Sequence, residues 1–271
     1  MKTFREHPIV SLMAVLTLAF MWLPLFVVIA NSLNSDKLLA HWGGFTLKWF
    51  KQAAADEAVR SGLVSSLEVA ALTTLVSVGL ALTGVLWWRR ASKRGRRVYD
   101  GLVYARIILP EVVFGMALFL IFTRLHVQLG VLTMVVGHSV WGSAFATVIL
   151  QARIRLLDEA VEQAAADLYA TPRAVFVKVT MPQLGPGLLA ASVLVFALSF
   201  DDVVTSFFLA GSSVNPLPLF VFGLIRFHVT PEVNAIGALV TLSMITLTLI
   251  AVWLLMRLFR GPGSIAARLG F

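Results

Sequence analysis

Residues 9–30 read IVSLMAVLTLAFMWLPLFVVIA, a run of 22 residues without one charged side chain. An α-helix needs about 20 apolar residues to cross the hydrocarbon core of a bilayer. Inside that core every backbone amide must find its partner within the protein, which leaves only helices or closed β-barrels. The run is too long for a barrel strand and lacks the strand's alternation of apolar and polar residues. It therefore predicts a membrane-spanning helix.

Five more apolar runs of this kind follow along the chain. They are residues 63–88, 102–122, 129–152, 187–210 and 234–256. The chain of 271 residues is 59% hydrophobic and only 13% charged, whereas a soluble domain carries about 25% charged residues. The sequence thus predicts an all-α polytopic membrane protein, with six spans in a single domain over residues 1–271.

The positive charges predict how the spans are oriented. Of the 22 Lys and Arg residues, 15 fall on the side of the predicted bilayer that holds both termini, six fall on the opposite side, and Arg106 lies within a span. Basic residues gather on the cytoplasmic side of membrane proteins, so both termini are predicted to be cytoplasmic. The basic cluster at residues 89–97 is expected to be an orientation determinant, and contact with anionic lipid head groups is the alternative. The net charge of +8 therefore does not indicate a nucleic-acid partner.

Several kinds of chemistry are not expected from this sequence. The chain has no Cys, which excludes thiolate metal sites. A lone histidine within a span, His138, is expected to be packed or hydrogen-bonded, and we predict no metal site. No catalytic constellation is present, and no Gly-x-x-x-x-Gly-Lys-Ser/Thr sequence that would bind a nucleotide.

The connection between the fourth and fifth spans, residues 153–186, has the pattern of two short cytoplasmic helices. Residues 156–168 favour the first helix. Thr171 followed by Pro172 is typical of the start of the second, because Thr caps a helix and Pro suits its first position.

The second of these helices is predicted to carry one apolar face, made by Val175, Phe176 and Val179. Residues 181–182, Met-Pro, are expected to end it, and Gly-Pro-Gly at residues 185–187 is expected to break the chain before the fifth span. An apolar face on the water side either receives a partner or packs on the protein's own surface, and the residues alone leave both open.

Charged residues within the spans are candidates for a transport path, because a charge at the bilayer centre costs about 2.5–3.5 kcal/mol on insertion scales. Asp201 and Asp202 are adjacent, and successive helical residues point about 100° apart. One of them is thus expected to line a path while the other pairs or caps a broken helix. Glu111 either lines the path or pairs with Arg106, and Ser199 either contacts a solute or satisfies a backbone carbonyl.

The run from Glu162 to Pro172, followed by Phe176 and by Met181-Pro182, resembles the EAA loop of bacterial ABC-importer permeases. In that family the loop forms a coupling helix that docks in a cleft of a cytoplasmic ATPase. The resemblance implies an ATPase-coupling role for the matching residues, which are Glu162, Gln163, Ala164, Ala165, Asp167, Leu168, Tyr169, Ala170, Thr171, Pro172 and Phe176.

Two positions of the loop depart from the family pattern. Gln163 stands where the family has Glu, and Tyr169 stands where it has Gly. Glycine there would allow a positive φ at the turn between the short helices, and Tyr pays a steric cost for that conformation. Either the backbone turns differently in this chain, or a second permease subunit carries the stronger coupling.

Residues 196–204 read FALSFDDVV and resemble the Ser-Leu-Asp-Asp segment of the spermidine/putrescine permease subunits. The resemblance continues at other segments, which are residues 31–34, 109–113, 207–211, 217–222 and 231–235. It implies the type I ABC-importer permease fold in a bacterial inner membrane. It also implies a polyamine path that includes Asp201, Asp202, Glu111 and Ser199.

The same resemblance implies a set of partners. They are a second, homologous permease, two ATP-binding-cassette ATPase subunits, an extracytoplasmic solute-binding protein and membrane lipid. ATP would be used by the ATPase, and this chain is expected to bind no cofactor and to be no enzyme.

Alternatives remain for the substrate. Permeases for ferric iron, thiamine or aminoethylphosphonate share parts of the pattern. A secondary transporter also uses intramembrane acids, but it often shows paired repeats and needs no docking loop.

Overall fold

The computed structural model describes residues 8–226 and 230–258, and these residues are almost entirely helical. Five helices are long and apolar enough to cross a membrane, and a bent helix pair makes the sixth crossing if it counts as one span. Within the described residues the only β-type pairing is one isolated bridge, between Asn34 and Phe45. The all-α prediction is confirmed. Lys2, Arg5, Arg260 and Arg268, which entered the orientation prediction, lie outside the described residues.

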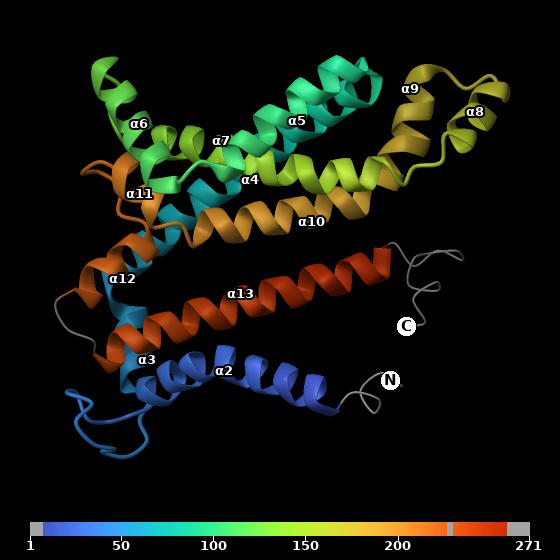
Figure 1. Cartoon of the computed structure of the whole chain (residues 1–271). Coiled ribbons are helices and arrows are strands. Elements are labelled where there is room, and N and C mark those ends of the chain that lie inside the picture. The colour runs from blue at the N-terminus through green and yellow to red at the C-terminus, as the bar shows by residue number, and fades with distance from the viewer. Residues whose placement is uncertain (1–7, 227–229, 259–271) are drawn as a thin grey trace. The chain divides into compact units, whose positions relative to one another are not determined.

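The helices follow one another along the chain as labelled in Figure 1. Their bounds are α2 (Pro8–Ser32), α3 (Lys48–Ala55), α4 (Glu57–Arg90), α5 (Lys93–Ile108), α6 (Glu111–Arg124), α7 (Val131–Ile154), α8 (Glu159–Asp167), α9 (Pro172–Val175), the π-helical turn η1 (Phe176–Thr180), α10 (Met181–Phe200), α11 (Val204–Leu209), α12 (Leu217–Ile225) and α13 (Pro231–Leu258).

The chain divides into two compact units, residues 1–60 with 220–245 and residues 61–219 with 246–271. In the first unit, Asn34 organises the loop after α2. Its amide oxygen accepts hydrogen bonds from the backbone N–H groups of Asp36 and Gly43, and its amide nitrogen donates to the carbonyl of His41. The indole of Trp49, which is buried, donates to the Asn34 carbonyl at 2.7 Å. The loop is therefore closed on itself and tied to α3.

The core of the second unit is formed by α4, α7 and α10. Small buried residues from all three helices meet there, including Ala81, Ala146 and Ala191. At Gly142 of α7 a Cβ would lie 2.5 Å from the Ser77 hydroxyl oxygen of α4, so a larger residue there would require the Ser77 side chain to shift. Small residues at helix contacts are typical of membrane proteins, in which close packing holds the helices together.

The third predicted span is not one continuous helix. The chain breaks after Ile108, and α5 and α6 meet at a bend of 100°. Leu109 is extended, with φ −62° and ψ 124°, because the ring of Pro110 disfavours a helical conformation in the residue before it. The prediction of an unbroken helix over residues 102–122 is wrong at this point.

The fifth predicted span also differs from expectation, at both ends. The helix does not stop at residues 181–182, and residues 185–187 do not break the chain, because η1 joins α9 directly to α10. At the far end α10 stops at Phe200, and a short non-helical segment separates it from α11.

The contact between α10 and α7 explains why Gly-Pro-Gly stays helical. A Cβ on Gly187, which is buried, would lie 2.9 Å from side-chain carbons of Arg153, so this glycine serves close packing. Pro186 cannot donate a hydrogen bond to the Pro182 carbonyl. The neighbouring Gln183 carbonyl accepts a hydrogen bond from Arg153 Nε at 2.7 Å. Membrane helices tolerate proline where such neighbours supply polar contacts.

The two short helices of residues 153–186 are present. The first begins at Glu159, three residues later than predicted, because the side chain of Asp158 caps it by accepting a hydrogen bond from Ala160 N. The second begins as predicted, with Thr171 accepting a hydrogen bond from Ala174 N and Pro172 in its first turn.

The turn between α8 and α9 has the positive φ that the family's glycine would favour. Tyr169 has φ +60°, so the alternative of a different turn is wrong. Tyr169 N donates to the Ala166 carbonyl, and Ala170 N donates to the Ala165 carbonyl. This pair of bonds is a Schellman motif, which places a left-handed residue just after the helix and is most often completed by glycine.

We expect Tyr169→Gly to stabilise this turn by about 1 kcal/mol, because glycine adopts the left-handed conformation without the steric cost of a side chain. Hydrogen exchange at the amides of Tyr169 and Ala170 would slow accordingly. Tyr169→Ala is the matched control, since it removes the ring and keeps the Cβ. Equal exchange in the two variants would show that the backbone cost is absent.

Candidate functional site

The break between α10 and α11 separates the two adjacent aspartates. Asp201, at the end of α10, has an exposed side chain. Asp202 is buried, and its carboxylate accepts hydrogen bonds from Thr205 N at 3.3 Å and Ser206 N at 2.7 Å. Asp202 therefore caps the first turn of α11, as predicted for one of the two aspartates, and the path-lining role predicted for the other stays a prediction.

A histidine of α7 holds Asp202 from the other side. Nε2 of His138 lies 3.1 Å from the Asp202 carboxylate, and Nδ1 lies 2.8 Å from the Ser199 hydroxyl. The His138 side chain has no exposed surface. A ring protonated on Nε2 suits both contacts, since Nε2–H donates to Asp202 and the Ser199 hydroxyl donates to Nδ1. The expectation that His138 is hydrogen-bonded is confirmed.

Glu111 joins the same network from α6. Its carboxylate accepts a hydrogen bond from the Thr205 hydroxyl at 3.2 Å, while Thr205 N donates to Asp202. Glu111 is the first residue of α6, just after the bend at Pro110. The side chain of Glu111 is exposed, and α11 packs against α6 and α7 (Figure 1). The two chain breaks therefore bring Glu111 and the aspartates to one place.

The predicted pair of Arg106 with Glu111 does not form. Among the ion pairs of residues 8–226 and 230–258, none joins these two side chains. The guanidinium of Arg106 lies over the ring of Phe114 instead, 3.7 Å from the ring centroid. A cation over an aromatic face is a favourable contact. It leaves the Glu111 carboxylate without an ion-pair partner in the described part of the chain.

The four predicted path residues thus fall into two groups. Asp201 and Glu111 are exposed, whereas Asp202 and Ser199 are buried and bonded to His138. Sequence reasoning did not connect His138 and Thr205 to the aspartates. An acid within a span does predict that hydrogen-bond partners lie nearby, because burial of an unpaired charge is costly. Which residues are those partners is identified only by the fold.

The predicted coupling residues also divide by exposure. Leu168 is 82% exposed and Tyr169 is 96% exposed, at the tip of the α8–α9 turn. The other exposed members are Gln163, Ala164, Asp167, Thr171 and Pro172, and the partly buried ones are Glu162, Ala165, Ala170 and Phe176. The loop therefore has one free face and one face turned toward its own unit.

Glu162 ties the loop to the end of α4. Its two carboxylate oxygens each accept a hydrogen bond from the Arg89 guanidinium at 2.9 Å, and one also accepts from the Thr180 hydroxyl at 2.7 Å. The bond from Arg89 holds the pKa of Glu162 below its ordinary value. Planar two-bond pairs of Arg with carboxylate have fixed geometry. Residues of α8, η1 and α4 are thus joined at one point.

Comparison with known proteins identifies relatives along most of the chain. Residues 74–261 match the family described as binding-protein-dependent transport system inner membrane component. The putrescine transport system permease protein PotI of Escherichia coli K12 is 32% identical, covering 82% of this chain and 81% of its own. The spermidine/putrescine transport system permease protein PotC of the same strain is 31% identical, covering 84% and 86%.

Solved structures share the fold at low sequence identity. A bacterial ABC transporter that imports the acidic polysaccharide alginate aligns with a TM-score of 0.68 and 14% identity, over 96% of this chain and 99% of that chain. An amino acid ABC transporter aligns with a TM-score of 0.60, over 79% of this chain and all of that chain. The fold is that of the type I ABC-importer permeases. This chain is a multi-pass inner-membrane transport subunit, not an enzyme, and it belongs to the family of binding-protein-dependent transport system inner membrane components.

Proposed function

We propose that this chain is one of two permease subunits in an ATP-driven importer of polyamines such as putrescine and spermidine. The observation that carries the substrate class is the pair of exposed acids, Asp201 and Glu111, beside a buried acid that is already fully bonded. Relatives of putrescine and spermidine systems at 31–32% identity support the same class.

A polyamine carries several ammonium groups, which require carboxylates that are not already neutralised by the protein. Among the described residues no salt bridge involves Asp201 or Glu111, so no lysine or arginine side chain contacts either carboxylate closely. Each such carboxylate attracts a cation, and the attraction strengthens where the path excludes water. In this proposal Asp201 and Glu111 contact the solute.

Asp202 and Ser199 take part differently. The carboxylate of Asp202 is hydrogen-bonded to His138 and to the first turn of α11, and the hydroxyl of Ser199 is hydrogen-bonded to His138. They fix the position of the α10–α11 break and therefore the direction in which Asp201 points. We thus assign them as positioning residues of the path.

The ATP-dependent step is assigned to separate subunits. Two ATPase subunits use ATP, and one of them binds the exposed face of the α8–α9 loop, where Leu168 and Tyr169 protrude. This chain then needs no cofactor of its own. The link between Glu162 and Arg89 then passes the motion of the bound ATPase to α4. Alternating access would follow as a rigid-body movement of packed helices.

The chain forms a single domain over residues 1–271, with both termini and the α8–α9 loop in the cytoplasm. A second, homologous permease completes the path, and an extracytoplasmic binding protein delivers the solute. The excess of Lys and Arg on the side of the termini supports this orientation.

Neutralising the exposed acids is expected to reduce polyamine uptake. Asp201→Asn and Glu111→Gln each remove a charged partner of the solute, and a hydrogen bond to a charged group is worth about 1.5–3 kcal/mol. The maximal uptake rate divided by KM is therefore expected to fall about ten-fold or more. Labelled putrescine and spermidine uptake by the reconstituted complex measures this. Glu57→Gln, at an exposed acid of α4 outside this network, is the control.

Normal uptake of both amines in both variants would remove the acidic path from the proposal. If thiamine, ferric iron or aminoethylphosphonate stimulates ATP hydrolysis and polyamines do not, the substrate class is wrong while the permease assignment stands.

Removing the histidine is expected to act on stability. His138→Leu removes one of the three hydrogen-bond donors of the buried Asp202 carboxylate, which keeps Thr205 N and Ser206 N, and the loss costs about 1.5–3 kcal/mol. His138→Gln, which retains a donor and an acceptor, is expected to lose less. Thermal unfolding and yield of the purified complex test this order. A His138→Leu complex as stable as the unchanged one would contradict the buried pair.

The bond between Glu162 and Arg89 is expected to couple hydrolysis to transport. Arg89→Glu or Glu162→Arg lowers the amount of solute moved per ATP, and the double exchange restores part of it. Glu159→Gln is the control, because Glu159 is 71% exposed and lies 3.4 Å from Arg89, farther than Glu162 does. Exposed ion pairs contribute little to stability. Unchanged stoichiometry in both single variants would refute the link.

The pH dependence of this coupling follows from the lowered pKa of Glu162. A lowered pKa means that the stabilisation is complete above the ordinary pKa and is lost only as the pH falls through the lowered value. The contribution of the Glu162–Arg89 pair to coupling is therefore expected to stay constant from roughly pH 6 to pH 8. The amount of solute moved per ATP, measured across that range, tests this.

A further inference from the structure

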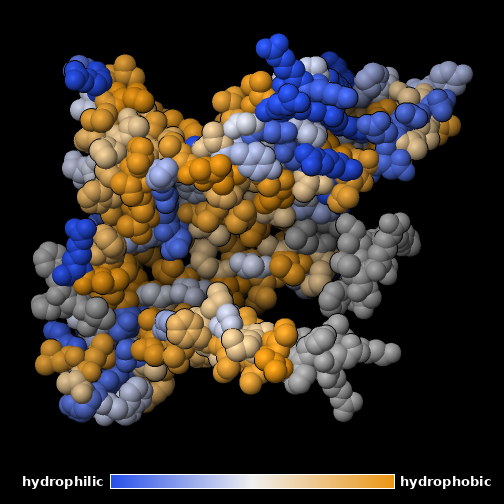
Figure 2. All heavy atoms as spheres, in the orientation of Figure 1, coloured by the Kyte–Doolittle hydropathy of each residue, from blue (hydrophilic) through white to orange (hydrophobic). Residues whose placement is uncertain are grey.

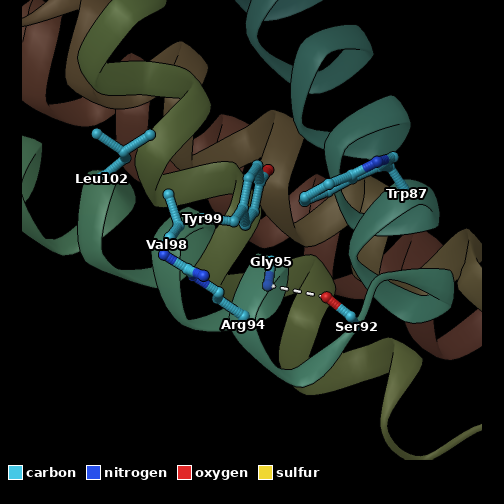
Figure 3. Close-up of a pocket in the computed structure, with 7 residues that line it drawn as sticks. All are labelled: Trp87, Ser92, Arg94, Gly95, Val98, Tyr99 and Leu102. Atoms are coloured by element: carbon cyan, nitrogen blue, oxygen red, sulfur yellow. Dashed lines mark hydrogen bonds between the residues drawn. The ribbon is translucent and has the colours of Figure 1, made fainter.

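A groove between the end of α4 and the first half of α5 is not used by the transport path. It encloses about 380 Å³ and is lined by Trp87, Ser92, Arg94, Gly95, Val98, Tyr99 and Leu102 (Figure 3). The side chain of Ser92 is engaged in capping α5 through Gly95 N at 3.2 Å. The open wall of the groove is thus made by aromatic, aliphatic and guanidinium groups.

Two aromatic rings form one end of the groove. The rings of Trp87 and Tyr99 stand 5.8 Å apart, tilted by 52°. The Tyr99 hydroxyl is bonded to Thr147 of α7 at 3.2 Å, which holds that ring in place. Trp87 is 54% exposed. Trp and Tyr with one polar and one apolar side concentrate at the level of lipid head groups.

The positive charge beside the groove is available to a ligand. Of the six basic residues at 89–97, Arg89 is paired with Glu162, and Arg96 donates to the backbone carbonyls that end α4. The other four are exposed and enter no ion pair among the described residues; they are Arg90, Lys93, Arg94 and Arg97. Only Arg94 of these four lines the groove.

The Arg94 side chain lies along α5 with its guanidinium beside Val98, and Leu102 follows one turn farther (Figure 3). Val98 is 58% exposed and Leu102 is 68% exposed, and α5 has no buried residue. Figure 2 shows hydrophilic side chains gathered around the α4–α5 turn, next to apolar surface along the helices. A cation followed by an apolar strip matches a ligand with an anionic head and a hydrocarbon tail.

We propose that this groove binds an anionic phospholipid, with its phosphate at Arg94, an acyl chain along Val98 and Leu102, and its head group on the side of the Trp87 and Tyr99 rings. That the lipid comes from the cytoplasmic leaflet rests on the orientation given under the proposed function. An orientation determinant needs only charge, whereas this surface adds a groove, a fixed aromatic pair and an apolar strip in register with the charge. The apolar strip favours a lipid over free phosphate.

Fluorescence quenching by brominated lipid tests the site in the assembled complex. The complex is placed in phosphatidylcholine nanodiscs containing an equal fraction of brominated phosphatidylglycerol or brominated phosphatidylcholine. The Trp87 signal is the difference between the complex and its Trp87→Phe variant. We expect the anionic lipid to be enriched about five-fold over phosphatidylcholine at Trp87. This is the enrichment that the attraction of roughly one basic residue for anionic lipid would produce.

Arg94→Gln is expected to abolish the preference for the anionic lipid, and Arg97→Gln to leave it unchanged. The second variant is the matched control, because Arg97 is an exposed cation of the same cluster that does not line the groove. Both variants lose one charge, so a general surface attraction would weaken equally in each.

Three results would overturn the site. They are equal quenching by the two lipids, equal effects of the two variants, or no Trp87-dependent quenching at all, which would mean that protein covers the groove. Loss of the preference on adding glycerol phosphate would assign the pocket to a soluble phosphate instead. None of these measurements depends on transport, so a failure of the polyamine proposal leaves them interpretable.

Discussion

The cost of placing a carboxylate in a lipid-embedded protein governs the arrangement of the second unit. Asp202 is 8% exposed, and a charge at such a position is tolerated only with close hydrogen-bond partners. Its partners are the imidazole of His138 and two backbone N–H groups that an intact helix would use internally. The break between α10 and α11 thus supplies two of the donors that the buried carboxylate requires.

This break has a consequence for the neighbouring residue. In a continuous helix Asp201 would follow the direction set by α10, whereas here it ends that helix and lies exposed while Asp202 is held inside. The second break, at Pro110, has the same effect for Glu111, which begins α6 beside Thr205. Each break places an acid at a helix end, where it can be presented without an ion-pair partner of its own.

Much of the architecture could be predicted because lipid imposes simple rules. Long apolar runs gave the helices, and the cap of α9 at Thr171 followed from local chemistry. Errors arose where tertiary contacts decide. Gly187 predicts a chain break from the sequence alone, but in the structure it allows close packing against Arg153 of α7. The partner of Asp202 is 64 residues away in the sequence, on another helix. The bend at Pro110 was visible in the sequence, since the residue before a proline avoids the helical conformation.

The α8–α9 loop combines one costly feature with one rigid feature. A tyrosine with φ +60° costs about 1–2 kcal/mol relative to a relaxed backbone, and its ring is almost wholly exposed, so packing of the ring against this chain does not offset that cost. The bonds of Glu162 to Arg89 and Thr180 fix the opposite face of the loop to α4 and η1. One face of the loop is thus held rigidly on α4 and η1, and the opposite face exposes the Tyr169 ring. Such a loop is suited to bind a partner and to transmit its movement to the helices. That arrangement agrees with the proposed role of the loop as the site where an ATPase subunit acts.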